Sequence, residues 1–294
     1  MKDKCTLCPR NCSVDRENGK TGYCGQTDKV YVARAALHMW EEPCISGKEG
    51  SGTVFFCGCT LRCIFCQNHQ IALGKVQSGD EIGKEISMER LKEIFLELQE
   101  IGANNINLVT GTHYIPQIAR ALKLAKEEGL RIPIVYNTSG YEKPESLHML
   151  DGLVDIYLPD MKYADSALAK TLSGAADYFP IAAEAIKAMV RQVGAPQWDG
   201  EKLKKGVVIR HLILPGQVEN SLKVLDWIGQ TFAPGQVLVS LMRQYTPMPG
   251  LTAPLDRKIT EDEYQAVLSW MYLNDLEGFT QEADAADTTF IPDF

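Results

Sequence analysis

Short apolar runs alternate along this chain with longer stretches in which apolar residues recur every three or four positions. Runs rich in Val, Ile and Leu that end in Gly, Asp or Thr are typical of buried parallel strands. They predict strands at 52–58, 105–111, 132–140, 154–160, 206–216 and 236–242. The amphipathic stretches predict helices at 87–102, 115–129, 143–152, 175–194, 218–232 and 260–275.

Strands that alternate with helices indicate an α/β protein with a parallel sheet and right-handed crossovers. Ser87 and Gly102 flank the first long helix as N-terminal and C-terminal signals. The pattern by itself fits both a curved, incomplete (β/α) barrel and an open, doubly wound sheet. Residues 281–294 are acidic and include two Phe residues, so we expect a tail there that packs on the body or frays.

The charge balance narrows the class of protein. The chain has 30 basic and 38 acidic residues and a formal charge of -8, which argues against a nucleic-acid-binding surface. It has no run of 18 apolar residues, and its first residues lack the apolar core of a signal peptide. We therefore expect a cytoplasmic protein that does not bind membranes.

The cysteines are distributed unevenly, because all nine lie within the first 66 residues. A disulfide framework is not expected in a cytoplasmic chain of this length, so the clustering indicates metal binding or redox chemistry. Cys44 and Cys57 fall outside the two groups described next, and we expect both to pack as core thiols.

Cys59, Cys63 and Cys66 have the spacing C-x3-C-x2-C directly after the first predicted strand. Three thiolates on a [4Fe–4S] cluster leave one iron open for an outside ligand, as in catalytic metal sites. The carboxyl end of a strand is also where α/β proteins bind their ligands. The alternatives are a zinc site that recruits a fourth cysteine such as Cys57, and a plain electron-transfer cluster.

The stretch CTLRCIFC, with Phe65 before its last cysteine and Asn68 soon after, resembles the cluster motif of the radical S-adenosylmethionine (SAM) superfamily. The resemblance implies an enzyme whose [4Fe–4S] cluster binds the amino and carboxylate groups of SAM. Reductive cleavage of SAM then yields a 5'-deoxyadenosyl radical, which takes a hydrogen atom from a substrate. The resemblance also implies a partial (β/α)6 barrel at 49–280, preceded by a cysteine-rich segment and connector at 1–48, and a flavodoxin or ferredoxin as reductant.

The later strand ends resemble those of the pyruvate formate-lyase activating enzymes. Where those enzymes carry Gly-Gly-Glu for the SAM amino group, this chain reads Thr-Gly-Thr-His at 110–113. Segments that resemble the Asp-Thr-Asn-Gly and Asp-x-Lys stretches around the SAM carboxylate follow at the third and fourth strands. The resemblance implies that SAM contacts Phe65, Asn68, Thr110, Gly111, Thr112, His113, Asn137, Thr138, Asp160, Lys162 and Gln244.

The chemistry of these side chains agrees with such a site. Lys162 is able to neutralise a carboxylate, and the oxygens of Asp160, Asn137 and Thr138 suit a monovalent cation beside it. The alternative is that these strand-end polar residues cap the following helices.

The first four cysteines form a second group. Cys5, Cys8, Cys12 and Cys24 have the spacing C-x2-C-x3-C-x11-C, which is typical of a closed site for zinc or for a second Fe–S cluster. The surrounding stretch has few large apolar residues, so we expect the metal to supply much of its stability.

The substrate is open at this stage. An activating enzyme would take a hydrogen atom from a glycine of a partner enzyme, but the altered 110–113 stretch also fits another protein or a small molecule. Arg210 and Arg243 are candidates for an anionic substrate or for a solvated face, and we expect His211 to be buried. The alternative class is a non-catalytic iron–sulfur or zinc protein that acts in electron transfer or as a binding module.

Overall fold

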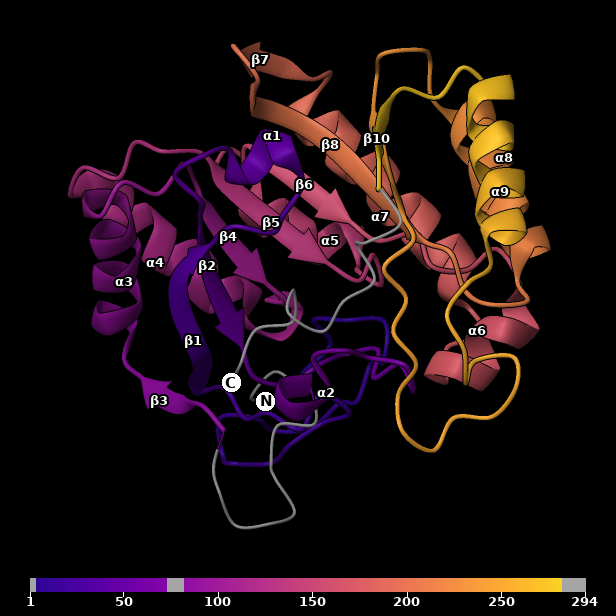
Figure 1. The fold of residues 1–294 in the computed structure, drawn as a ribbon. Coiled ribbons are helices and arrows are strands. Elements are labelled where there is room, and N and C mark those ends of the chain that lie inside the picture. The colour runs from indigo at the N-terminus through magenta and orange to yellow at the C-terminus, as the bar shows by residue number, and fades with distance from the viewer. Residues whose placement is uncertain (1–3, 73–81, 282–294) are drawn as a thin grey trace.

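Ten strands form one sheet in the computed structural model, which describes residues 4–72 and 82–281 (Figure 1). The order across the sheet is β10 (Gly278–Thr280), β9 (Leu238–Met242), β8 (Lys202–Leu212), β6 (Ile156–Pro159), β5 (Ile134–Thr138), β4 (Ile106–Val109), β2 (Ser51–Phe56), β1 (Val30–His38) and β3 (Lys84–Ile86), with β7 (Gln197–Asp199) paired to β8. The tail expected at 281–294 lies outside the described residues from 282 onward.

The six predicted strands are present and adjacent. They are β2 (Ser51–Phe56), β4 (Ile106–Val109), β5 (Ile134–Thr138), β6 (Ile156–Pro159), β8 (Lys202–Leu212) and β9 (Leu238–Met242). Each pairs in parallel with the next. Their order follows the chain in one direction, without the reversal that defines a doubly wound sheet. The predicted α/β class and partial barrel are therefore confirmed.

Further strands extend both edges of this parallel array. They are β1 (Val30–His38) and β3 (Lys84–Ile86) at one edge, β10 (Gly278–Thr280) at the other, and β7 (Gln197–Asp199) beside β8. β1 was predicted to be part of a connector, because its centre, Ala-Arg-Ala-Ala at 33–36, lacks the large β-branched residues that mark strands. β1 shares the sheet with the barrel strands, and the division of the chain at residue 48 stays a prediction.

The predicted helices follow their strands. They are α3 (Met88–Glu100), α4 (Ile115–Glu127), α5 (Pro144–Leu147) with the 3-10 turn η2 (His148–Leu150), α7 (Tyr178–Val193), α8 (Val218–Thr231) and α9 (Glu261–Leu273). The unpredicted ones are short: α1 (Pro43–Ser46), α2 (His69–Ala72), α6 (Ser166–Ser173) and the 3-10 turn η1 (Thr112–Tyr114). Ser87 caps α3 as predicted, since its hydroxyl accepts the Arg90 N–H at 3.1 Å.

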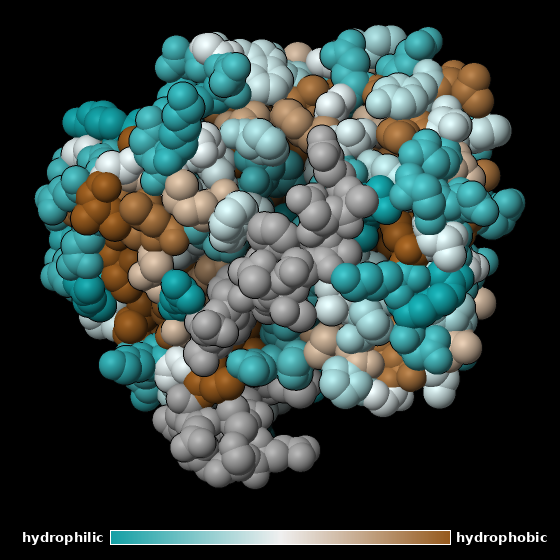
Figure 2. Space-filling view, in the orientation of Figure 1, coloured by the Kyte–Doolittle hydropathy of each residue, from teal (hydrophilic) through white to brown (hydrophobic). Residues whose placement is uncertain are grey.

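The long helices cover the outer face of the curved sheet, with α3 beside α4 at one side and α8 beside α9 at the other (Figure 1). Phe95, Leu122, Ile186 and Val224 of these helices are fully buried against the sheet. Hydrophilic and hydrophobic residues are intermixed on the face shown in Figure 2. Among the described residues, no helix combines the length and the apolar content needed to cross a membrane.

Candidate active site

The loop that follows β2 carries the three-cysteine motif. Gly58 turns the chain there with a φ of 88°, a backbone conformation that favours glycine. The backbone N–H groups of Leu61 and Arg62 then donate to the Cys59 sulfur at 3.3 and 3.4 Å. Hydrogen bonds of this kind stabilise negative charge on a thiolate and tune Fe–S clusters.

Burial raises the pKa of two of these thiols, Cys63 and Cys66. It raises the pKa of Cys66 to about 12, and neighbouring Cys63 and Cys59 add repulsion while Lys162 opposes it. The pKa of Cys63 is raised by the same burial. Buried thiols of this type lose their protons when a metal supplies the compensating positive charge.

The three cysteines line one cavity of about 250 Å³ together with side chains from the neighbouring strand ends. This cavity contains most of the residues predicted from the family resemblance: Phe65, Asn68, Thr110, Asn137, Asp160, Lys162 and Gln244. Parallel strands in chain order bring their carboxyl ends to one edge of the sheet, so residues far apart in the sequence meet there.

A charged network forms the polar wall of the cavity. Asp160, which follows β6, accepts hydrogen bonds from Lys162 Nζ at 2.6 Å and from Arg210 Nε at 3.0 Å. The Arg210 guanidinium also donates to Asn137 Oδ1 at 2.6 Å. Burial alone would raise the pKa of Asp160, but the Arg210 and Lys162 cations hold that pKa below its ordinary value. Arg210 therefore belongs to the site and not to a solvated face.

Glu41, which was not among the residues predicted from the sequence, joins this network from the segment between β1 and α1. Its carboxylate lies 3.4 Å from Arg210 Nη1 and accepts from Asn137 Nδ2 at 3.3 Å. Burial raises the pKa of Glu41 above its ordinary value, and the nearby Arg210 cation opposes part of that increase. The available signal was a pair of adjacent glutamates, Glu41 and Glu42, between the apolar residues Trp40 and Pro43.

The remaining predicted residues lie behind the cavity wall. Thr112 and Thr138 donate their hydroxyls to the Glu142 carboxylate, at 2.6 Å for Thr112. His113 pairs through Nε2 with the Cys57 carbonyl at 2.7 Å, and Gly111 packs against a helix side chain. Of the 110–113 stretch, Thr110 alone is among the described residues that line the cavity.

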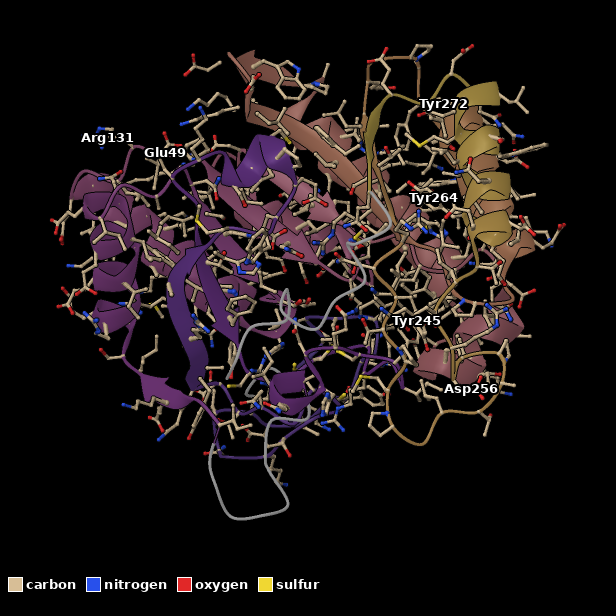
Figure 3. The ribbon with its side chains drawn as sticks, in the orientation of Figure 1. Glu49, Arg131, Tyr245, Asp256, Tyr264 and Tyr272 are labelled. Carbon is tan, nitrogen blue, oxygen red and sulfur yellow. The ribbon has the colours of Figure 1, made fainter. Side chains whose placement is uncertain are left out.

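Two of the other candidates are placed elsewhere. His211 is fully buried as predicted, paired with the Met161 carbonyl at 2.7 Å and with Ser221 at 2.8 Å. Arg243 forms an ion pair with Glu261 at 2.9 Å, and its guanidinium lies 4.2 Å from the ring centre of Tyr264, which Figure 3 labels. Arg243 is not among the described residues that line the cavity.

The four N-terminal cysteines are neighbours of one another. Cys8 interacts electrostatically with Cys12 and Cys24, and Cys24 does so with Cys5 and Cys12. Burial raises the pKa of Cys8 to about 12. The Tyr23 N–H donates to the Cys12 sulfur at 3.2 Å. Burial, mutual repulsion and an N–H directed at one sulfur are typical surroundings of thiolate ligands, although these four described cysteines do not converge on one point as the ligands of a single metal ion do.

In the described part of the chain, no three His, Cys, Asp or Glu side chains converge as the ligands of one metal ion do. A four-iron cluster is larger than one ion and spreads its thiolates more widely. The arrangement of Cys59, Cys63 and Cys66 around one cavity wall is therefore compatible with a [4Fe–4S] cluster.

Comparison with known proteins shows the family of this chain. Residues 53–228 match the family model of the radical SAM superfamily, so the chain belongs to that superfamily, whose members use SAM and a [4Fe–4S] cluster. The uncharacterized protein MJ0674 of Methanocaldococcus jannaschii is 29% identical over 269 residues, which cover 90% of this chain and 73% of that protein.

Two solved structures illustrate the similarity of the fold to known proteins. The FeFe-hydrogenase maturase HydG from Carboxydothermus hydrogenoformans matches with a TM-score of 0.53 and 13% identity over 79% of this chain and 54% of HydG. Methylornithine synthase (PylB) matches with a TM-score of 0.50 and 16% identity over 76% of this chain and 68% of PylB. The chain thus spans about half the length of HydG.

Proposed function

We propose that this protein is a radical SAM enzyme that abstracts a hydrogen atom from its substrate. The observation that carries the proposal is one cavity lined by Cys59, Cys63 and Cys66 and by the Asp160–Lys162 pair. An electron-transfer protein would not require a polar strand-end pocket beside its cluster. When bound at the three thiolates, a [4Fe–4S] cluster supplies the electron that cleaves SAM to methionine and a 5'-deoxyadenosyl radical.

Different side chains of the cavity are suited to bind different groups of SAM. Lys162 offers a positive charge to the SAM carboxylate, and Thr110 offers an oxygen acceptor to the N–H groups of the SAM amino group. Asn137 belongs to the network on the carboxylate side, where its Oδ1 accepts from Arg210. Asp160 neutralises Lys162 and Arg210, so a monovalent cation would bind at its carboxylate only in place of one of these two side chains. Phe65 is buried against Tyr163 and Tyr245, so it forms a fixed apolar wall that helps exclude water from a radical.

The resemblance to activating enzymes extends the proposal to the substrate. We propose a glycine of a partner enzyme as the hydrogen donor, and a flavodoxin or ferredoxin as the source of the electron. The Thr-Gly-Thr-His stretch at 110–113 departs from the activating enzymes, and it leaves Thr110 as the residue of that stretch that lines the cavity. A test with candidate partner proteins follows the demonstration of SAM cleavage.

Anaerobic reconstitution with iron and sulfide, followed by dithionite and SAM, tests the core of the proposal. We expect about four irons for the three-cysteine cluster and formation of 5'-deoxyadenosine. Replacement of Cys59, Cys63 or Cys66 by Ala should abolish the product. Cys44→Ala is the matched control, because Cys44 is a buried thiol that does not line the cavity.

Two results would contradict the proposal. Tight zinc binding at the three-cysteine motif, with no iron retained, would exclude a [4Fe–4S] cluster there. A fully loaded cluster that forms no 5'-deoxyadenosine and shows no spectral change with SAM would favour the non-catalytic electron carrier.

A further inference from the structure

The N-terminal cysteine segment is anchored directly to the loop that carries the three-cysteine motif. Arg10 lies between Cys8 and Cys12 in the sequence. Its guanidinium donates to the backbone carbonyls of Thr60 at 2.9 Å and Leu61 at 3.3 Å, both located between Cys59 and Cys63. Part of the cluster loop is therefore held by a side chain that the other cysteine group positions.

The same guanidinium reaches a third segment. It donates to the carbonyls of Ser173 at 2.9 Å and Gly174 at 2.6 Å, at the end of α6. Charge-assisted hydrogen bonds to several carbonyls make a rigid connection, because the planar guanidinium has a fixed donor geometry. Arg10 thus joins the cysteine segment, the cluster loop and α6.

Tyr23 provides a second connection, next to Cys24 in the sequence. Its hydroxyl donates to the Leu61 carbonyl at 3.4 Å, and its backbone N–H donates to the Cys12 sulfur at 3.2 Å. The Arg10 guanidinium lies 3.9 Å from the centre of its ring. One residue therefore contacts a sulfur of the first group and the backbone of the second loop.

The two loops also touch through their backbones. A Cβ atom at Gly58, the residue before Cys59, would lie 2.7 Å from the Cys24 carbonyl oxygen. Arg62, within the same loop, has a φ of 55°, a conformation that a residue other than glycine adopts only when its surroundings hold it. The contacts of Arg10 and Tyr23 with the adjacent carbonyls supply that support.

We infer that the two cysteine groups are coupled: metal bound at Cys5, Cys8, Cys12 and Cys24 holds Arg10 and Tyr23 in place, and these residues organise the loop for its cluster. The inference rests on the proposed function in one respect, namely that Cys59, Cys63 and Cys66 bind a [4Fe–4S] cluster. Arg10 and Tyr23 are positioning residues in this account. Because coupling between two binding sites is reciprocal, each metal centre increases the affinity of the other.

Iron release from the reconstituted full chain measures this coupling. Zinc, iron and sulfide are first counted, which also identifies the N-terminal metal. Iron loss to a chelator is then followed together with the SAM-induced change in the EPR signal of the reduced protein. That spectral change reports the cluster with an open iron, and it separates the two groups if both bind Fe–S.

The variants are Arg10→Gln, Tyr23→Phe and Cys24→Ala. We expect Arg10→Gln and Cys24→Ala to release iron from the three-cysteine cluster about tenfold faster or more, since hydrogen bonds to a charged group are lost. Tyr23→Phe removes one hydroxyl and keeps the ring, so a smaller acceleration of about threefold is expected, and this variant decides the test if Arg10→Gln fails to fold.

Arg131→Gln is the matched control. Arg131 also donates to backbone carbonyls, those of Lys126 and Leu130, but it lies on the periphery of the molecule (Figure 3). The Arg131→Gln variant should release iron at the wild-type rate.

Wild-type rates and EPR spectra in Arg10→Gln, Tyr23→Phe and Cys24→Ala would overturn the coupling, while 5'-deoxyadenosine formation would leave the proposed function intact. In the opposite case, faster iron release in the variants of a protein that never forms 5'-deoxyadenosine would support the coupling and remove the proposed function.

Discussion

Replacement of Asp160 by Asn removes the carboxylate that accepts from both Lys162 and Arg210 and leaves two buried cations facing each other. The nitrogen–oxygen distances are 2.6 and 3.0 Å, and the side chains of Asp160, Lys162 and Arg210 are 12%, 17% and 16% exposed. At an effective dielectric constant of about 20, each attraction amounts to about 6 kcal/mol before desolvation. Desolvation of the carboxylate offsets much of this, so we expect a net loss of about 3–5 kcal/mol in the free energy of unfolding.

Equilibrium urea unfolding, with equal metal content in all variants and no SAM, measures this loss. With a slope of about 3 kcal/mol/M, the midpoint should fall by about 1 M or more. The control is Glu219→Gln, because Glu219 pairs with Lys223 at 3.9 Å and both side chains are more than half exposed. That change should alter the free energy by less than about 1 kcal/mol.

A double variant tests the reason for the loss. Arg210→Gln removes one of the stranded cations, so Asp160→Asn with Arg210→Gln should lose clearly less free energy than the sum of the single changes. The folded-state pKa of Asp160 is lowered, so its contribution is present above the unfolded pKa of about 3.9 and disappears as the pH falls through the folded value. A loss for Asp160→Asn no larger than that for Glu219→Gln would show that the Asp160 carboxylate does not stabilise the two cations.

Three further changes test the fold around the site. Gly140→Ala should lower the free energy of unfolding by about 3 kcal/mol or more, because φ is 77° and a Cβ would overlap the Asp160 carbonyl. Gly129→Ala, which has open space around it, should lower it by about 1–2 kcal/mol, and thermal unfolding measures both. Burial lowers the pKa of His211 to about 4, so its contribution to stability is present above about pH 6.5 and lost as the pH falls through 4. Between pH 6.5 and pH 4 the free energy of unfolding should fall by about 3 kcal/mol less in His211→Gln than in the wild type. An equal fall in both proteins would contradict a neutral, buried His211. Thr260→Ala should cost about 1 kcal/mol in urea unfolding, since it removes the capping box of α9, and no change would show that the cap is dispensable.

Local patterns in the sequence were sufficient for the elements of the barrel. The six strands and their helices were predicted because a buried face repeats apolar residues at short spacings along the chain. That spacing can be recognised in the sequence without knowledge of any long-range contact. The three-cysteine motif was recognisable for the same reason, since its ligands are only a few positions apart. β1 begins with Val30, Tyr31 and Val32, but it was missed because the small and charged residues at 33–36 interrupt that strand signal.

The direction of side chains at the strand ends was beyond such reasoning. Thr110 lines the cavity, whereas Thr112, two residues later, turns behind the wall toward Glu142. The backbone turns at Gly111 into η1 between the two, and the Thr112 hydroxyl then reaches Glu142, which follows β5. The family resemblance indicated the stretch, but not which of its residues reach the cavity.

The α/β class, the superfamily motif and the two groups of cysteines were predicted from the sequence, because each depends on residues that are close together along the chain. The strand order without reversal, the contact of Glu41 with Arg210 beside the cavity and the hydrogen bonds of Arg10 to the cluster loop became known from the three-dimensional structure. These contacts join segments that are far apart in the chain. Strand order and loop conformation bring them together, and no local periodicity records either one.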